Sequence, residues 1–292
     1  MSVLTNLDRV FTLYARILEK PTLWAVSSQK LMRFLFAATA PMWHRLPRGC
    51  RLQKDPDGTL HITPQGAETA GLFFYIHGGG FTLGSPTTNR AVAAHIVHAA
   101  GLRAYCVRYP LAPEHPFPAA PDAVFGAYSA LVEAGTVPVA IGGDSAGGNL
   151  ALLTMQRARD AGLPLPKAMV LMAPVADLSD DLEARFAQAA SEYLIPAVWA
   201  KRIERAYLRD TDPASPAVSP LLGDLRGLPP TLIHTAEGEA LSQDAKALAA
   251  RMDDATLDIW PGLPHVWHLK AGVAPAATQA CAELGAFIKA HA

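Results

Sequence analysis

Short apolar runs of strand type alternate with helical patterns along most of this 292-residue chain, and this alternation restricts its fold more than any other feature. From residue 51 onwards, we predict strands at 71–76, 102–108, 137–141, 168–172, 231–235 and 256–260. Helical patterns occupy 91–100, 122–133, 146–161, 242–252 and 276–290. Strands that alternate with helices form right-handed crossover units, so the sequence predicts an α/β fold with a mostly parallel sheet.

Two helical segments stand outside this alternation. Residues 1–48 have apolar residues at helical spacing, and Lys20-Pro21 predicts a break between two helices there. Residues 178–215 form a helical insert that ends in the turn-rich sequence TDPASPAVSP. Because residues 1–48 contain no predicted strand, we expect them to pack on the main domain, residues 49–292, rather than to fold alone.

The composition excludes several classes of protein. Half of the residues are apolar, and 25 Lys and Arg against 26 Asp and Glu leave a formal net charge of −1, so no excess of cations is available to bind nucleic acid. Cys50, Cys106 and Cys281 are odd in number and widely spaced, which predicts reduced thiols and neither a disulfide framework nor a zinc site. The most apolar stretch, residues 34–43, is about half as long as a membrane-spanning helix requires. We expect no targeting segment, no stable membrane insertion and a cytoplasmic location.

The pentapeptide Gly143-Asp144-Ser145-Ala146-Gly147 has the pattern G-x-S-x-G between a predicted strand and a predicted helix. This context is typical of a nucleophile elbow, whose tight turn needs glycines where no Cβ fits. The following helix N-terminus directs unpaired N–H groups toward a developing anion. An ordinary strand-to-helix turn is the alternative, but the flanking elements favour a nucleophilic Ser145.

A second glycine-rich motif, His77-Gly78-Gly79-Gly80-Phe81, follows an earlier predicted strand. Consecutive glycines let backbone N–H groups approach an oxyanion without interference from side chains. A flexible loop or a phosphate-binding loop is the alternative, but neither standard glycine pattern of a nucleotide site is present. We predict that His77 anchors this loop and transfers no proton.

Together with YPLAPEHPFPAA (109–120) and GDSAGGNLAL (143–152), the HGGGF motif resembles the hormone-sensitive-lipase-like family of α/β-hydrolase esterases. APVADLS, SPLLGDLRGLPPTLI and PGLPHVWH extend the resemblance over about residues 60–290. It implies an eight-stranded sheet, a cap made of residues 1–48 and the insert at about 178–215, and carboxylesterase activity on short to medium acyl chains. It also implies that the N–H groups of Gly78, Gly79 and Ala146 are the oxyanion donors. The residues that it implies support the site are His77, Gly80, Gly143, Asp144 and Gly147.

His265 is the predicted general base. It follows a predicted strand and a Pro/Gly turn, and it lies C-terminal to the serine, as the chain order of this fold requires. A serine is a poor nucleophile unless a neighbour with a pKa near neutrality takes its proton. His268 is the alternative base, which we interpret as structural. His234 lies within a predicted buried strand and is interpreted as a core histidine.

Three carboxylates compete for the role of the acid that orients His265. Asp258 lies inside a predicted strand, away from the loops that carry the chemistry of such folds. Asp244 falls in the first turn of a predicted helix, where its interaction with the helix dipole predicts a contribution of at most about 1 kcal/mol. Glu239 lies in the loop before that helix, and we predict that it is the acid. Many family members carry D-P-L here, and Glu239-Ala240-Leu241 resembles the subgroup that uses glutamate.

These residues predict a serine carboxylesterase that acts on a small-molecule ester without a metal or another cofactor. A lactone hydrolase or a deacetylase with the same triad is the alternative, and a small-molecule receptor that has lost catalysis is a further one. The resemblance also suggests a homodimer. Six bulky residues of the predicted cap are candidates for the wall of an acyl pocket, namely Leu31, Phe34, Phe36, Phe186, Tyr193 and Trp199.

Overall fold

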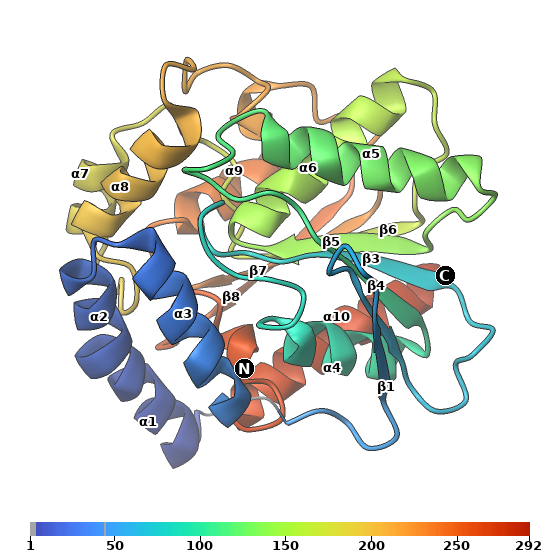
Figure 1. Cartoon of the computed structure of the whole chain (residues 1–292), viewed down its shortest axis with the longest axis horizontal. Coiled ribbons are helices and arrows are strands. Elements are labelled where there is room, and N and C mark those ends of the chain that lie inside the picture. Colours follow the sequence, from blue (N-terminus) through green and yellow to red (C-terminus); the bar gives the residue numbers. More distant parts are fainter. Residues whose placement is uncertain (1–3, 44) are drawn as a thin grey trace.

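One eight-stranded sheet crosses the molecule between layers of helices in the computed structural model, which describes residues 4–43 and 45–292 (Figure 1). The strand order is β1-β2-β4-β3-β5-β6-β7-β8. β2 (Leu60–Thr63) pairs in antiparallel fashion with both of its neighbours, β1 (Arg51–Lys54) and β4, and the remaining pairs are parallel. The parallel strands are β3 (Leu72–Ile76), β4 (Arg103–Val107), β5 (Ala140–Asp144), β6 (Ala168–Met172), β7 (Thr231–Ala236) and β8 (Ala255–Trp260). The predicted α/β fold with a mostly parallel, eight-stranded sheet is confirmed.

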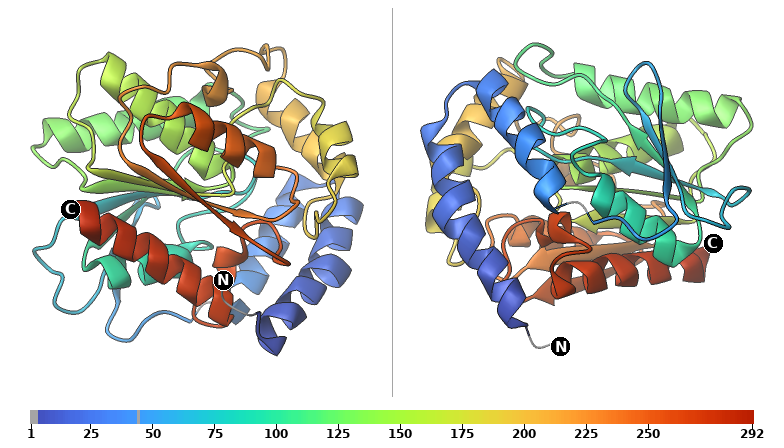
Figure 2. Two further views of the ribbon diagram at one scale, coloured as in Figure 1. Left: turned by 180° about the vertical axis from the view of Figure 1, so that it is seen from behind. Right: turned by 60° about the horizontal axis from the view of Figure 1, so that its bottom comes forward.

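Helices cover both faces of this sheet (Figures 1 and 2). On one face lie α5 (Ala119–Glu133), α6 (Ala146–Asp160) and α9 (Ser242–Arg251), and on the other lie α4 (Arg90–Ala100) and α10 (Pro275–His291). An apolar core lies on each face of the sheet. Alternate residues of β3 pack in these two cores, Phe74 in the first and Phe73 in the second. Burial on both faces explains why the central strands are continuously apolar rather than alternating.

β5 starts three residues later than the sequence predicts and runs up to Asp144, directly before Ser145. The predicted start was wrong because Val137 is exposed and Pro138 has no N–H for a sheet ladder. Gly142 and Gly143 lie inside the strand despite their low strand propensity. A Cβ on Gly142 would clash with the carbonyl of Val170 on β6, so packing against neighbouring strands decides this boundary.

The N-terminal helices pack beside the sheet and lie next to one another in both views of Figure 2. They are α1 (Asn6–Tyr14), the π-helical turn η1 (Ala15–Glu19), α2 (Lys20–Ala25), α3 (Gln29–Thr39) and the short η2 (Ala40–Trp43). The predicted break at Lys20-Pro21 was wrong, because the chain stays helical from residue 6 to 25. The wide turn lets the Lys20 N–H bond to the carbonyl of Ala15, and Pro21 sits in the first turn of α2, where a missing N–H costs little.

The insert contributes α7 (Leu182–Gln188) and α8 (Ala197–Leu208), and α8 lies beside the N-terminal helices (Figure 1). Polar contacts join the two segments: Lys20 Nζ donates to the carbonyl of Glu192, and Arg202 Nη1 donates to that of Val26. Two short helices lie outside the insert, η3 (Pro220–Leu222) before β7 and η4 (Trp267–Lys270) before α10. None of the helices in the described ranges combines the length and the apolar character needed to span a bilayer.

Candidate active site

Ser145 occupies a strained turn between β5 and α6. Its backbone angles are φ 53° and ψ −118°, in a region that non-glycine residues rarely adopt. Gly143 and Gly147 make this turn possible, because a Cβ on Gly147 would clash with the carbonyl of Ile76 and one on Gly143 with Gly147 itself. The strand–turn–helix context expected for G-x-S-x-G is therefore present.

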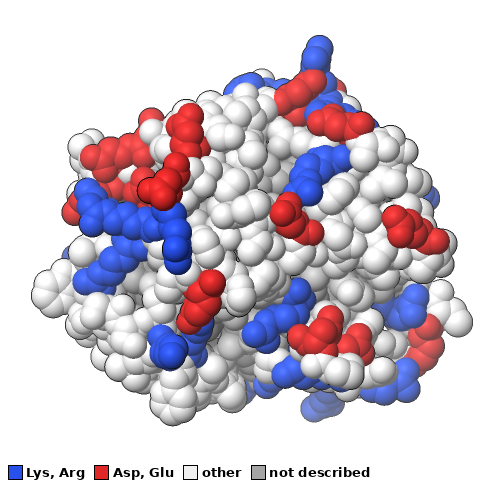
Figure 3. All heavy atoms as spheres, turned by 45° about the horizontal axis from the view of Figure 1, so that its top comes forward, with Lys and Arg blue, Asp and Glu red and all other residues white. Residues whose placement is uncertain are grey.

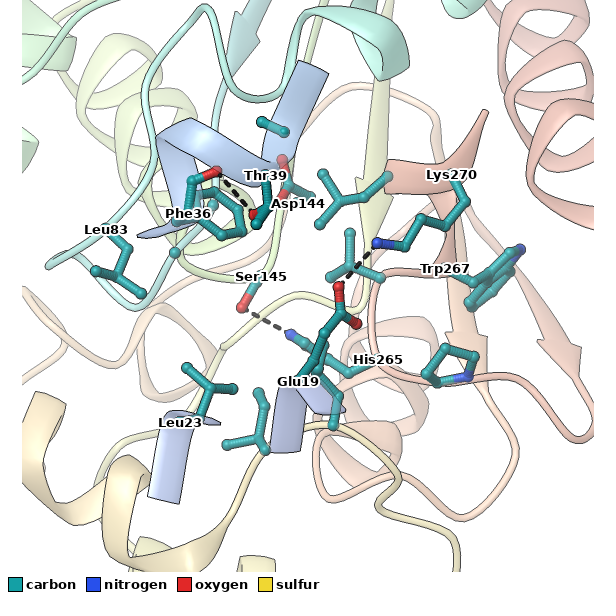
Figure 4. A pocket seen from close by; sticks show the side chains of 18 of the residues that line it. Glu19, Leu23, Phe36, Thr39, Leu83, Asp144, Ser145, His265, Trp267 and Lys270 are labelled. Atoms are coloured by element: carbon teal, nitrogen blue, oxygen red, sulfur yellow. Dashed lines mark hydrogen bonds and ion pairs between the residues drawn. The ribbon is translucent and has the colours of Figure 1, made fainter. Parts of the chain in front are cut away.

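The parallel strands deliver three polar side chains to the same edge of the sheet. His265, which follows β8, places Nε2 2.9 Å from Ser145 Oγ (Figure 4). Glu239, which follows β7, places Oε2 2.5 Å from His265 Nδ1. The other Glu239 oxygen accepts hydrogen bonds from Thr235 Oγ1 at 2.8 Å and from the Ala236 N–H at 2.7 Å. All three residues are at most 7% exposed, so water competes little with these contacts.

Electrostatics in this buried cluster favours a proton on His265. Burial disfavours the imidazolium, but the charge and hydrogen bond of Glu239 outweigh it, and Glu192 and Asp144 add to them, so the pKa of His265 is raised. Glu192 was missed by the sequence analysis. It is 6% exposed and accepts N–H groups of Leu194, Ile195 and Ala240, and burial raises its pKa. Its position in the helical insert carried no motif that points to the site.

The glycine-rich loop lies against the turn that carries Ser145. His77 is buried, stacks on Tyr109 with ring centroids 4.3 Å apart and bonds through Nδ1 to the carbonyl of Gly78 at 2.9 Å. Burial lowers the pKa of His77 to about 4, so the ring is neutral at physiological pH. The hydrogen bonds and ring stacking of His77 join it to its own loop and to Tyr109, which fits the expected anchoring role.

Asp144 fastens this loop to the nucleophile turn. Its buried carboxylate accepts Tyr75 Oη at 2.5 Å, Asn89 Nδ2 at 3.2 Å and the N–H of Gly78. Burial raises the pKa of Asp144, and these hydrogen bonds partly offset that effect. The N–H of Gly78 is therefore already engaged by the Asp144 carboxylate in this structure. The assignment of Gly78 as an oxyanion donor, which the family resemblance implied, does not fit this geometry.

The rival histidines and Asp258 lie elsewhere. His268 Nε2 is 3.2 Å from Nδ1 of His234, both rings are fully buried, and burial holds the pKa of His268 well below its usual value. Asp258 faces His234 Nε2 at 3.6 Å rather than His265. With Glu283, His234 and Asp258 place three possible metal ligands within 4.8 Å of one another, a grouping that the sequence did not indicate. None of the three is among the residues lining the pocket of Ser145.

Asp244 lies in the first turn of α9 as predicted, but the helix dipole does not explain its environment. Its side chain is 4% exposed, pairs with Arg185 and accepts the N–H groups of Ala176 and Asp177. Burial raises the pKa of Asp244 to about 6 although these contacts lower it, so the carboxyl is mostly ionised at neutral pH. The helix dipole alone therefore does not describe the environment of Asp244, because the expectation of at most about 1 kcal/mol left out Arg185 and the N–H groups of Ala176 and Asp177.

We expect Asp244→Asn to lower the free energy of unfolding by about 3 kcal/mol, because it leaves the half-buried Arg185 without its counter-charge. Urea unfolding at pH 7.5 measures the change, and the folded variant should keep its catalytic constants. As the control, Asp224→Asn removes an exposed ion pair with Arg226 and should cost under about 1 kcal/mol. Equal losses in the two variants would contradict this interpretation of Asp244.

A mostly apolar cavity of about 370 Å³ opens at Ser145 (Figure 4). Of the six predicted wall residues, Phe36 and Trp199 line it, whereas Leu31, Phe34, Phe186 and Tyr193 do not. Phe34 is 67% exposed because it lies two residues from Phe36, on another side of α3. The lining instead includes residues with no motif of their own, such as Leu18, Leu23, Leu83 and Trp267.

One ion pair lies within this apolar lining. Lys270 Nζ is 2.8 Å from Glu19 Oε1, and Figure 4 shows the pair on the side of His265. The contact joins the N-terminal helices to η4, the short helix that follows His265, across 251 positions of the chain. Neither residue stood out in the sequence, since only the fold brings the two together.

A parallel sheet that brings a serine, a histidine and a carboxylate into a hydrogen-bonded chain at one edge defines an α/β-hydrolase. Comparisons with known proteins agree. A family model described as "alpha/beta hydrolase fold" matches residues 73–269. An acetyl-hydrolase of Streptomyces hygroscopicus is 40% identical and covers 74% of each chain. The putative acetyl-hydrolase LipR of Mycobacterium tuberculosis is 34% identical over 89% of this chain and 87% of its own.

Solved structures extend the similarity to the whole chain. The crystal structure of an esterase from the bacterial hormone-sensitive lipase family superimposes with a TM-score of 0.88 at 33% identity, covering 100% of this chain and 99% of that one. A mutant of esterase E40 gives a TM-score of 0.89 at 32% identity, with coverage of 98% and 99%. The chain belongs to the α/β-hydrolase fold family, among its hormone-sensitive-lipase-like carboxylesterases.

Proposed function

We propose that Ser145, His265 and Glu239 are the catalytic triad of this carboxylesterase. The observation that carries the proposal is the continuous chain of hydrogen bonds from Ser145 Oγ through the His265 ring to Glu239. In this arrangement His265 Nε2 takes the serine proton while Oγ attacks an ester carbonyl, and then delivers that proton to the leaving alcohol. Water hydrolyses the acyl-enzyme in a second step that again uses His265 as the base.

Glu239 fixes the tautomer of His265. Its Oε2 accepts the Nδ1–H, which leaves Nε2 free to take a proton from Ser145. Two donors, Thr235 Oγ1 and the Ala236 N–H, hold the other carboxylate oxygen and prevent the side chain from rotating. The carboxylate also stabilises the imidazolium that forms during each proton transfer.

The tetrahedral oxyanion is held by backbone N–H groups from two loops. Ala146 begins α6 and so presents an N–H at the positive end of that helix. Gly79 and Gly80 follow Gly78 along the pocket wall, and their N–H groups are the other two donors. Gly80 replaces Gly78, which the resemblance implied, because the N–H of Gly78 is directed at Asp144. Asp144 and His77 are positioning residues, because they hold the loop without touching the reacting atoms.

Residues 1–48 and the insert around 178–215 form the cap of this enzyme. Three features support this division: the two segments contact each other, both supply residues to the pocket, and the residues described in them contribute no strand to the sheet. The substrate is a small-molecule ester whose acyl chain lies in the apolar cavity. The unpaired Cys50, Cys106 and Cys281, two of them buried, are consistent with a cytoplasmic location.

We expect optimum activity on nitrophenyl esters with acyl chains of roughly four to eight carbons. Each methylene buried in the cavity adds about 0.8 kcal/mol of binding until the chain meets the wall, and longer chains are then rejected. Phe36→Ala should shift the optimum to longer chains, because it removes part of that wall. The measurement is kcat/KM for esters of two to sixteen carbons.

Phe34→Ala is the matched control, since Phe34 lies on the same helix but outside the cavity, and it should leave the wild-type profile unchanged. A maximum at two carbons with a steep fall above would instead indicate a deacetylase, the second candidate suggested by the names of two relatives. Better activity on sixteen-carbon than on four-carbon esters would refute the proposed wall. No turnover of any of these esters would refute the proposed ester hydrolysis altogether.

A further inference from the structure

Exposed apolar side chains gather on the N-terminal helices. Of the thirteen large apolar side chains that are exposed in the described part of the chain, nine lie between residues 7 and 42. Scattered exposed apolar residues are normal, but a contiguous group of this kind marks an interaction surface. Nine such residues within one short segment therefore indicate that these helices contact a partner.

On α1 and η1 this group lies opposite the side that packs on the enzyme. The inner side of α1 and η1 buries Phe11 and Ala15, and Phe11 packs in a cluster with Trp260. The outer side of the same two helices carries Val10, Leu13 and Ile17 at helical spacing, each more than half exposed. A helix that is apolar on both sides is normally enclosed on both. We call the exposed set the outer cap face, which consists of Val10, Leu13, Ile17, Trp24, Leu31 and Phe34.

The outer cap face is separate from the substrate cavity. None of its six side chains is among those that line the cavity, whereas Leu18 and Leu23 on α1–α2 and Phe36 on α3 are. The same helices therefore present one side to the cavity and another to solvent. The segment from residue 6 to 25 is helical throughout and about 30 Å long, which is sufficient for an extended contact.

The charges on these helices select an anionic partner. Arg9, Arg16 and Lys30 are exposed there, and the two acids in the described part of this segment are both engaged. Asp8 is buried and accepts the Ala276 N–H, and Glu19 pairs with Lys270. The whole chain has a net charge of −1, and on the face shown in Figure 3 acidic and basic side chains are interspersed. Exposed cations therefore lie on the same helices as the apolar side chains of the outer cap face.

We propose that the outer cap face docks on an anionic lipid surface. Trp, Leu, Ile and Phe side chains reach the boundary between headgroups and acyl chains, while Arg9, Arg16 and Lys30 contact headgroup phosphates. The helices lie on the surface, since no helix of the described residues suits a spanning position. A second copy of the chain fits this face less well, because a two-fold contact would bring the arginines of both copies together.

Docking in this way places the substrate cavity beside the lipid, because α1–α2 and α3 are shared between the two surfaces. Under the function proposed above, esters dissolved in the lipid surface would then be within reach of Ser145. This consequence rests on the proposed function, but the docking itself does not.

Sedimentation with vesicles tests the proposal. The wild type should bind vesicles of phosphatidylglycerol and phosphatidylcholine much more strongly than vesicles of phosphatidylcholine alone, and added salt should weaken the binding. Arg9→Gln with Arg16→Gln should weaken it roughly thirtyfold. Leu13→Ser with Ile17→Ser and Trp24→Ser should weaken it at least about tenfold. The matched controls change exposed residues elsewhere, Lys167→Gln with Lys246→Gln and Leu52→Ser with Val137→Ser, and should bind as the wild type does.

Two further measurements separate docking from catalysis and folding. All of these variants should hydrolyse soluble nitrophenyl butyrate at the wild-type rate, and inactive Ser145→Ala should bind vesicles normally. Absence of binding to anionic vesicles at low salt would overturn the proposal, as would equal losses in the control variants. A wild-type dimer that the Leu13, Ile17 and Trp24 substitutions convert to a monomer would overturn it as well, because the face would then be a contact between two copies.

Discussion

Replacing Ser145 by alanine is expected to lower kcat for ester hydrolysis by roughly 10⁶-fold, because the variant loses the hydroxyl that lies 2.9 Å from His265 Nε2 and attacks the ester. Residual turnover would come from substrate binding and the oxyanion donors alone. The thermal midpoint should change little, since the small side chain is removed from a turn that glycines and Asp144 hold in place. Single-turnover assays on nitrophenyl butyrate measure the loss.

Covalent labelling gives an independent test of the same assignment. A fluorophosphonate should modify Ser145 alone, and Ser145→Ala should abolish labelling. Ser85→Ala is the control, because Ser85 lies in the neighbouring loop and bonds to Thr88. Modification of a peptide that contains Ser85 or Ser219 would show that the nucleophile has been misassigned.

The second large effect is expected from Glu239→Gln, which should lower kcat by about 10³–10⁴ with little change in KM. The hydrogen bonds explain the size of the loss. Because Thr235 Oγ1 and the Ala236 N–H both donate to Oε1, the glutamine would keep its carbonyl there and turn its NH₂ toward His265. Nδ1 of His265 must then accept a hydrogen bond from that NH₂, so the ring hydrogen sits on Nε2, which no longer serves as a base for Ser145.

The pH dependence of kcat/KM separates this explanation from a loss of folding. His265 must be neutral to accept the serine proton, so activity rises with pH through its pKa, which is raised above 6.5 in the wild type. Removal of the Glu239 charge leaves burial as the main influence, so the acid limb of Glu239→Gln should move to lower pH. Asp244→Asn is the control, and its acid limb should stay in place. The opposite pattern would make Asp244 the acid.

The sequence could predict the features that depend on local pattern. Continuous apolar runs separated by helical periodicity predicted the parallel sheet, and β6 was placed within its observed limits, Ala168–Met172. Ser145 could be predicted because a strand, a glycine turn and a helix are adjacent in the chain. His265 and Glu239 could be predicted because each follows a predicted strand, and parallel strands bring their carboxyl ends to the same edge of the sheet.

What the tertiary structure alone decided depends on contacts between distant segments. Phe36 lines the cavity and Phe34 faces solvent, although both are bulky apolar residues of one helix. Asp244 is a buried partner of Arg185, 59 positions away, and Glu19 meets Lys270 across 251 positions. The Gly78 N–H is turned to Asp144 by the packing of two loops. Such pairings follow from how the helices and strands pack together. Local sequence patterns determine the individual elements but not their packing, so no local pattern could have revealed these pairings.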